Sequence, residues 1–265
     1  MRLGFIGAGN MGGAILRGVL AEGCIAAKDI VISDTNKDLC QNIAAQTGVA
    51  AASCNADLAS CCDMILLAVK PVFLKGVIDE IKPCLQGKAV ISIAAGWTVD
   101  MLTAALGEGV EVLRTMPNTP ALVGEGMTAL CAENNFSESN YTYAKMLFEA
   151  VGKVCTIPER LFDGFIAVSG SSPAYVFMLI EAMADAAVKE GIFRKDAYRM
   201  AAQAVLGSAK MVLDTGKHPG ELKDMVCSPA GTTIEAVAAL EAGGFRASVI
   251  DAMSACAEKS REMSK

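Results

Sequence analysis

The sequence contains very little histidine: His218 is the single one among 265 residues. A Ser-His-Asp triad would have to use His218 as its base. His218 stands directly before Pro219 and Gly220, in a turn context. We therefore expect a solvated or helix-capping histidine and no hydrolase triad.

Paired cysteine motifs are absent as well, although the chain has ten cysteines. No two of them are spaced as CxxC, and one histidine cannot complete a Cys/His zinc pattern. The sequence thus predicts neither a metal site nor a disulfide framework. We expect the cysteines to be small core residues of a protein in a reducing compartment.

A basic excess and a membrane-spanning run are also lacking. The net charge is −6 at pH 7, without a basic cluster, which argues against nucleic acid as a partner. No apolar run reaches the roughly 18 to 20 residues that span a bilayer, so no membrane partner is expected. The N-terminal segment "MRLGFIGAGNMGG" is glycine-rich where a signal peptide has its apolar core. These features predict a soluble cytoplasmic protein.

The first 159 residues do contain a regular alternation of apolar strands with helical segments. Such an alternation implies a parallel sheet with helices on both faces, as in the Rossmann-type α/β fold. The predicted strands cover residues 2–7, 29–34, 63–71, 89–95, 111–118 and 153–159. We assign residues 1–159 to a dinucleotide-binding domain.

The pattern changes near residue 160 to long alanine-rich helices. Residues 171–191 form one that begins with serine and proline, and residues 194–216 form one that ends at a glycine. Both are apolar on more than one face, which in a domain of this size indicates burial against a second chain. Residues 160–265 are therefore predicted to form an all-α dimerisation and substrate domain.

A glycine motif follows the first predicted strand and opens the first helix. In this context a GxGxxG pattern indicates a dinucleotide site. Gly7 permits a tight turn, Gly9 lets the backbone approach a pyrophosphate, and Gly12 brings helix and strand together. The helix N-terminus then faces the phosphates with unpaired N–H groups. The predicted contacts in this loop are Gly7, Ala8, Gly9, Asn10, Met11 and Gly12.

Further cofactor contacts are expected at the carboxyl ends of the other strands, where open α/β sheets bind ligands. Asp34 ends the second strand, and an acidic residue there bonds the adenosine ribose and disfavours the 2′-phosphate of NADP. Lys37 lies close by and could offset that repulsion, so NADH and NADPH both stay open. The remaining predicted cofactor contacts are Asn55, Ala68, Val69, Lys70, Pro71, Ala94 and Asn118.

A second conspicuous segment, "DMVCSPAGTTIEAV" at 224–237, lies near the C-terminus. Residues 228–231 predict a tight turn that leads into a helix capped by Thr232 or Thr233. The loop itself carries no charged side chain and no histidine. A turn at a helix N-terminus can nevertheless bind a carboxylate through backbone N–H groups and the helix dipole.

Together these segments resemble one family along essentially the whole chain. The similarity lies in "FIGAGNMG", "LLAVKP", "SIAAG", "RTMPNTP", "SGSSPAYVF", "GSAKMVL" and "HPGELKDMVCSPAGTTIEAV", which occur in the order typical of pyrroline-5-carboxylate reductases. The first segment is shared by many dehydrogenases, whereas "SGSSPAY" together with "CSPxGTT" is specific. The resemblance implies reduction of Δ1-pyrroline-5-carboxylate to L-proline with NADPH or NADH, the last step of proline biosynthesis. It also implies a homo-oligomer, at least a dimer, with a decamer of five dimers as a larger family assembly.

The resemblance further implies how the substrate is held. Backbone N–H groups of Ala230, Gly231 and Thr232 would bind the substrate carboxylate. Thr233, the implied catalytic residue, would place its hydroxyl beside the substrate nitrogen. Additional implied substrate contacts are Ser228 and Ser171.

Two positions depart from the family pattern. Ala230 stands where the family loop usually has glycine; at φ > 0 the alanine would cost about 1 kcal/mol, and at φ < 0 little would change. Asp34 stands where members that prefer NADPH commonly have a small hydroxyl residue. Both the loop geometry and the choice of cofactor are therefore questions for the structure.

Two alternative functions fit parts of the pattern. A β-hydroxyacid dehydrogenase has a similar domain order but needs a lysine acid/base early in the first inter-domain helix. This chain has no lysine between Ser169 and Asp185, and Lys189 lies near the end of that helix. A non-enzymatic, dinucleotide-sensing dimer fits the first half equally well, but it gives no reason for "CSPAGTT".

Overall fold

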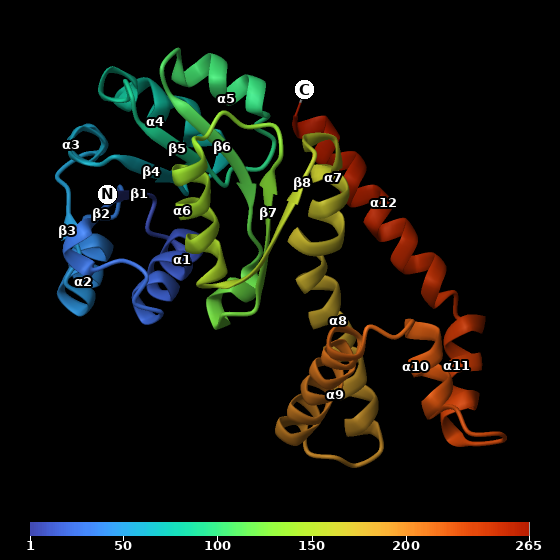
Figure 1. Ribbon diagram of the computed structural model, residues 1–265. Coiled ribbons are helices and arrows are strands. Elements are labelled where there is room, and N and C mark those ends of the chain that lie inside the picture. The colour runs from blue at the N-terminus through green and yellow to red at the C-terminus, as the bar shows by residue number, and fades with distance from the viewer. Residues whose placement is uncertain (265) are drawn as a thin grey trace. The chain divides into compact units, whose positions relative to one another are not determined.

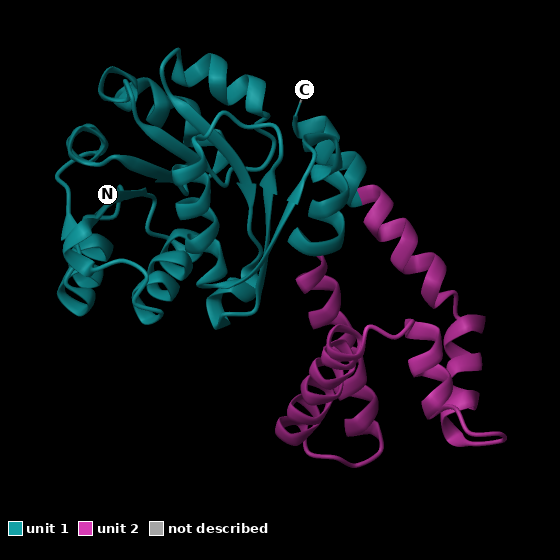
Figure 2. Cartoon of the chain, viewed as in Figure 1, with its two compact units in different colours: residues 1–171, 256–265 teal, residues 172–255 magenta. Residues whose placement is uncertain are grey.

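The computed structural model describes residues 1–264, which divide into two compact units (Figure 1, Figure 2). Unit 1 consists of residues 1–171 together with the C-terminal segment from residue 256. Unit 2 consists of residues 172–255. This division differs from the boundary that the sequence predicts between residues 159 and 160.

Unit 1 is built on an eight-stranded sheet with the order β3-β2-β1-β4-β5-β6-β7-β8. The strands are β1 (Leu3–Ile6), β2 (Ile30–Ser33), β3 (Ala50–Ala51), β4 (Met64–Leu67), β5 (Ala89–Ser92), β6 (Glu111–Met116), β7 (Gly126–Cys131) and β8 (Gly152–Ile157). All neighbouring strands are parallel except β6 and β7, which are antiparallel. The strands β1, β2, β4 and β5 are buried along their whole length, as their continuous apolar sequences predict.

Helices cover both faces of this sheet. They are α1 (Asn10–Ala21), α2 (Lys37–Thr47), α3 (Asn55–Cys61), α4 (Pro71–Ile81), α5 (Val99–Leu106), α6 (Glu138–Glu149) and the short α7 (Phe162–Phe165). Successive strand residues point to opposite faces: Phe5 packs in a core with α1, α2 and α6, and Ile6 in a core with α3, α4 and α5. The predicted Rossmann-type fold is confirmed.

The strand β7 is not among the strands that the sequence predicts. The chain leaves β6 at Met116, passes a 3-10 turn (Thr119–Val123) and returns as β7. Gly126 begins this strand, and a Cβ at Gly152 of β8 would collide with its backbone. The close approach of these two glycines lets β7 and β8 pair in parallel from their first residues.

The segment that follows β8 belongs to unit 1, which explains why the boundary falls after residue 171. Phe162 and Phe165 of α7 are buried against Met116 and other side chains of the sheet. Arg114 of β6 forms an ion pair with Glu159 at 2.7 Å, and its guanidinium lies 4.5 Å from the centre of the Phe162 ring. These contacts hold residues 159–165 on the sheet.

Unit 2 is entirely helical. It contains α8 (Ser172–Lys189), α9 (Arg194–Thr215), α10 (Pro219–Val226), α11 (Thr232–Ala242) and the first part of α12 (Phe245–Met263). The predicted glycine stop is confirmed, since Gly216 caps α9 in the left-handed conformation with φ of 63°. Large apolar side chains of α8, such as Phe177 and Met178, stay exposed within the chain.

One exposed helical stretch differs from the expectation that no apolar run is long enough to span a bilayer. Among the described residues, the helical stretch Glu159–Lys189 is long and apolar enough to cross a membrane, by length and composition only. Asp163 and Glu181 interrupt this stretch, so it does not contain an unbroken apolar run of that length. Only 11% of its most apolar window is buried inside the chain. A soluble subunit that associates through this surface would show the same property.

Candidate functional site

The glycine loop between β1 and α1 has the geometry of a phosphate-binding turn. Gly7 adopts a positive φ of 99°, and its N–H donates to the Ser33 carbonyl oxygen at 2.8 Å. A Cβ at Gly12 would collide with the Gly7 carbonyl oxygen, so Gly12 allows α1 to approach the strand. By contrast, a Cβ at Gly9 would meet no atom within 4 Å. Gly9 therefore faces open space, as expected where a ligand approaches the backbone.

The helix α1 begins directly after this loop. Gly9 is its N-cap residue, and no side chain caps the helix. The first N–H groups of α1 are thus left for another acceptor, and the helix dipole favours a negative one. Asn10 and Met11 of this first turn line a cavity at the same place.

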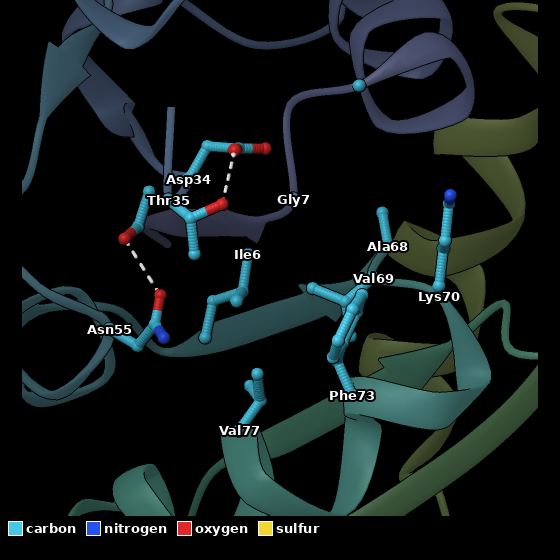
Figure 3. Close-up of a pocket in the computed structure, with 12 residues that line it drawn as sticks. Ile6, Gly7, Asp34, Thr35, Asn55, Ala68, Val69, Lys70, Phe73 and Val77 are labelled. Atoms are coloured by element: carbon cyan, nitrogen blue, oxygen red, sulfur yellow. Dashed lines mark hydrogen bonds between the residues drawn. The ribbon is translucent and has the colours of Figure 1, made fainter. Parts of the chain in front are cut away.

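Two cavities lie along the carboxyl ends of the parallel strands. The first, which we call the β2 cavity, has a volume of about 350 Å³ and is shown in Figure 3. The second, the β5 cavity, has a volume of about 410 Å³. Both are lined by Gly9, Ala68, Val69 and Lys70, so they adjoin along the end of β4. Together they form one cleft at the strand ends, where α/β sheets of this kind bind dinucleotides.

Most of the predicted cofactor contacts line these cavities. The β2 cavity contains Gly7, Gly9, Asp34, Asn55, Ala68, Val69 and Lys70, and the β5 cavity adds Asn10, Met11, Pro71 and Ala94. Two further loop residues lie beside the cleft without lining it. Ala8 donates its N–H to Asp34, and Gly12 provides the close contact between helix and strand.

Asn118 lies in neither cavity. Its side chain is 8% exposed, and its amide nitrogen donates to the carbonyl and the hydroxyl of Ser169 at 3.0 and 3.1 Å. Its amide oxygen accepts from the Met127 N–H at 2.8 Å. Asn118 thus joins the end of β6 to β7 and to the turn that precedes α8, and its contact with the cofactor stays a prediction.

Asp34 is fixed at the end of β2 by the backbone. Its Oδ2 accepts from the Ala8 N–H at 2.8 Å, and its Oδ1 accepts from the Asn36 N–H at 2.9 Å. Thr35 lies beside it in the β2 cavity (Figure 3). Burial, and secondly the negative charge of Asp34, raise the pKa of the nearby Cys40 thiol. Asp34 is the one acidic residue among those that line this cavity.

Asn55 is held at the start of α3. Its Oδ1 accepts from the buried Ser33 hydroxyl at 2.8 Å, a bond visible in Figure 3. Its amide nitrogen donates to Glu80 at 2.7 Å. The side chain is positioned by both neighbours, and it presents a polar wall to the β2 cavity.

Sequence reasoning missed the apolar wall of the β2 cavity. Phe73 and Val77 of α4 line it opposite the polar residues (Figure 3), and the Phe73 side chain is 62% exposed. Their i, i+4 spacing places both on one helix face. A phenylalanine two residues after the strand-end Pro71 is the signal that the sequence offers. The other missed residues are Ile6, Ser33 and Thr35 in this cavity, and Ile93, Ala95 and Pro117 in the β5 cavity.

The loop 227–231 in unit 2 differs in detail from the expectation. Ala230 has φ of 55°, so the strained alternative applies, and α11 is capped by Gly231 rather than by Thr232 or Thr233. The Gly231 N–H is already bonded to the Ser228 carbonyl oxygen at 3.1 Å. Gly231 cannot therefore offer that N–H to a ligand without opening the turn. Within residues 1–264, the N–H groups of Ala230 and Thr232 and the Thr233 hydroxyl have no hydrogen-bond partner.

Two other predicted residues have defined surroundings. The hydroxyl of Ser171 accepts a hydrogen bond from the Cys256 thiol at 3.2 Å. His218 is the N-cap of α10, and its Nδ1 accepts from the Gly220 N–H at 3.0 Å. The expectation of a capping histidine is confirmed. Among the described residues, no group of three or more His, Cys, Asp or Glu side chains could hold a metal ion.

Comparisons with known proteins cover the whole chain. Residues 159–263 match the family model described as pyrroline-5-carboxylate reductase dimerisation, and residues 2–96 match that of NADP oxidoreductase coenzyme F420-dependent. Pyrroline-5-carboxylate reductase of Escherichia coli (strain K12) is 49% identical over 100% of this chain and 98% of its own length. The enzyme of Methanosarcina acetivorans is 43% identical over the same shares of the two chains. The crystal structure of Plasmodium falciparum pyrroline carboxylate reductase with NADP bound is 34% identical, with a TM-score of 0.91, and covers 100% of this chain and 98% of the other. The motifs and the fold of this chain agree with those of these relatives. The chain belongs to the pyrroline-5-carboxylate reductase family.

Proposed function

We propose that this protein reduces the cyclic imine 1-pyrroline-5-carboxylate to L-proline with NADH or NADPH, the last step of proline biosynthesis. The observation that carries the proposal is the identity of 49% to a reductase of that name over the whole chain. Neither alternative is retained. A β-hydroxyacid dehydrogenase needs a lysine early in α8, but Lys189 is the last residue of that helix. A dinucleotide-sensing dimer would give the loop 227–231 no role.

The residues of unit 1 fit a dinucleotide. Gly9 leaves open the space that a Cβ would fill, and the uncapped N-terminus of α1 faces the same cleft. A pyrophosphate there would accept from the first N–H groups of the helix. When bound, the reduced nicotinamide supplies the hydride for the reaction.

The substrate itself explains why a loop without charged side chains is sufficient. It is a cyclic imine that bears a carboxylate, and its protonated nitrogen makes the adjacent carbon a strong hydride acceptor. The protein has to bind the carboxylate and orient that carbon, which is a task of positioning. Backbone N–H groups at a helix N-terminus can meet the charge of the carboxylate.

Within unit 2, the start of α11 supports this role. The N–H groups of Ala230 and Thr232 are available for the carboxylate, whereas the Gly231 N–H is used inside the turn. The hydroxyl oxygen of Thr233 would accept a hydrogen bond from the protonated substrate nitrogen, and Ser228 completes the loop. Ser171 is proposed as an additional substrate contact because its hydroxyl keeps bonding capacity beyond the Cys256 thiol.

We further propose a cytoplasmic homodimer formed by the helices after residue 158. The dimerisation model matches residues 159–263, and the exposed apolar side chains of α8 need a partner surface. Assembly of five such dimers into a decamer would follow the family pattern. All ten cysteines are free thiols, which fits a reducing compartment.

The direct test is cofactor oxidation by the purified protein with pyrroline-5-carboxylate, and detection of proline as the product. We expect oxidation of NADH, NADPH or both that depends on the imine. Gly9→Val provides the matched control, because a Cβ at this position would meet no atom within 4 Å and the side chain would extend into the open space at the loop. It should remain folded and lose dinucleotide binding. A folded wild-type protein that produces no proline with either cofactor would overturn the proposal.

A further inference from the structure

The end of the β2 cavity beside Asp34 carries a fixed negative charge. The Ala8 and Asn36 N–H groups each bond one carboxylate oxygen, at 2.8 and 2.9 Å. The Thr35 hydroxyl also donates to Oδ1, at 3.4 Å. The side chain is thus held in place before any ligand arrives, and Oδ2 keeps a lone pair. A ribose with a free 2′-hydroxyl can donate to such a lone pair, whereas a 2′-phosphate would face a like charge.

Lys37 is the cation closest to Asp34 in the sequence, but its ammonium is committed elsewhere. Its Nζ donates to the Ser53 carbonyl oxygen at 2.9 Å. Lys37 does not line the β2 cavity. In this arrangement Lys37 therefore does not offset the negative charge of Asp34, which the sequence alone leaves open.

The N-terminus of α2 could in principle hold a phosphate near the same ribose position. Asn36 already caps that helix, because its Oδ1 accepts from the Leu39 N–H at 3.0 Å. Asp38 in the first turn adds another negative charge. One of the first N–H groups of this helix is thus satisfied by the chain itself, and its dipole is already met by an acidic side chain.

The other polar groups around the cavity offer no compensating charge either. The Asn55 amide donates to Glu80, which places a second carboxylate next to the cavity wall. Lys70 is the single cation among the residues that line the β2 cavity. In Figure 3 it lies on the opposite side of Gly7 from Asp34, following β4. A 2′-phosphate at Asp34 would thus meet acidic groups without a cation beside them.

We propose that this chain prefers NADH to NADPH, with Asp34 as the residue that determines the preference. The identity of the reaction rests on the proposed function, but the preference concerns binding and can be measured without turnover. The NADP bound to the Plasmodium falciparum relative is no obstacle, because the preference follows from this chain's own residues around Asp34.

Equilibrium binding of NAD⁺ and NADP⁺ to the wild-type protein, measured by isothermal titration calorimetry, tests the preference directly. We expect NAD⁺ to bind at least about tenfold more tightly, because the 2′-phosphate faces an uncompensated carboxylate. The difference should narrow as salt is raised, since salt screens an exposed like-charge contact.

Variants of Asp34 test the assigned residue. Asp34→Ser removes the charge and the anchor of the Ala8 N–H, whereas Asp34→Asn removes the charge and keeps an acceptor. Both should lower the ratio of NAD⁺ to NADP⁺ affinity by about tenfold or more. Asp38→Asn is the matched control: it removes the same charge from the neighbouring helix turn and should leave the ratio unchanged. Lys37→Ala should leave NADP⁺ affinity unchanged as well.

The inference is overturned if the wild-type protein binds NADP⁺ as tightly as NAD⁺, or if Asp34→Asn leaves the ratio unchanged. Selective loss of NADP⁺ affinity in Lys37→Ala would also overturn it, because Lys37 would then contact the phosphate. Tighter binding of NADP⁺ than of NAD⁺ by a protein that forms proline would refute the preference and leave the proposed reaction standing. Preferential NAD⁺ binding without proline formation would refute the reaction and leave the preference standing.

Discussion

Ala230 is the single described residue other than glycine with a positive φ, at 55°. An L-residue in that conformation brings its Cβ close to a backbone carbonyl, which costs roughly 1 to 2 kcal/mol. Glycine avoids this contact but has more conformational freedom in the unfolded chain. This freedom offsets part of the stability that relief of the strain would add. The residue thus stores strain directly before the proposed substrate-binding helix.

We expect Ala230→Gly to raise the free energy of unfolding by about 0.5 to 1 kcal/mol, the net of these two effects. Urea denaturation of the two proteins measures the change. Ala238→Gly on α11 serves as control, because a glycine inside a helix should lower the free energy of unfolding by about 1 kcal/mol. A loss of stability in Ala230→Gly would show that the loop relaxes in solution.

Thr233 provides a second prediction at the residue scale. If its hydroxyl contacts the substrate nitrogen, Thr233→Val should lower kcat/KM about 5- to 150-fold, because a buried partner loses a hydrogen bond. Dinucleotide affinity should stay nearly the same. Thr232→Val keeps the backbone N–H that we assign to the carboxylate and should retain activity. Full activity of Thr233→Val would mean that "CSPAGTT" only caps α11 and that Thr233 does not contact the substrate nitrogen.

At the scale of elements, the sequence predicted those strands and helices whose own residues determine them. β1, β2, β4 and β5 were recognised because each is a short, fully buried apolar run. β7 was not, because "GMTALC" follows a loop rich in proline and glycine, and its pairing depends on the distant β8. In the same way, GxGxxG identified the phosphate loop, whereas the Phe73 wall depends on how α4 packs beside β4. The cap of α11 was misassigned because the threonines fit the usual N-cap preference, and the left-handed Ala230 moves the cap to Gly231.

The contact between β6 and the turn after β8 supports a prediction about stability. Arg114 is 3% exposed and pairs with Glu159, which also accepts from the Val99 N–H at 2.7 Å. Glu159→Ala would leave a buried guanidinium without its partner, so we expect a loss of about 3 kcal/mol of unfolding free energy. Glu149→Ala, which breaks the exposed pair with Lys145, should change stability little. Equal effects of the two substitutions in chemical denaturation would contradict this assignment.

At the scale of the whole molecule, the exposed apolar helices predict an obligate dimer whose interface resembles a divided core. We expect light scattering to give a dimer or a larger even assembly at every concentration at which the protein is folded and active. Mutation of the exposed Phe177 to Glu should weaken this assembly, whereas Phe73→Glu at the cofactor cleft should leave it intact. A stable, active monomer would contradict the proposed dimer.

The thiols of unit 1 predict a loss of stability in alkali. Burial raises the pKa of Cys62 and of Cys131 from 9.0 to about 12. Between pH 9 and pH 12 the folded chain keeps both thiol protons, whereas the unfolded chain releases them. The contribution of the two thiols to the free energy of unfolding is therefore complete below about pH 9 and is lost toward pH 12. The free energy of unfolding should fall by up to about 1.4 kcal/mol per pH unit for each thiol. Cys131→Ala should flatten this slope in urea titrations at several pH values, and an unchanged slope would refute the role of that thiol.

The path of the chain through its two units has a consequence for biosynthesis. Unit 1 includes the C-terminal end of α12, where the Ser260 hydroxyl donates to Asp163 at 2.6 Å, and a Cβ at Gly96 would meet the Met263 carbonyl oxygen at 2.9 Å. A ribosome makes these residues after all of unit 2. The nascent sheet can therefore form early, as N-terminal domains do during synthesis. Its final contacts must wait until the last turns of α12 leave the exit tunnel.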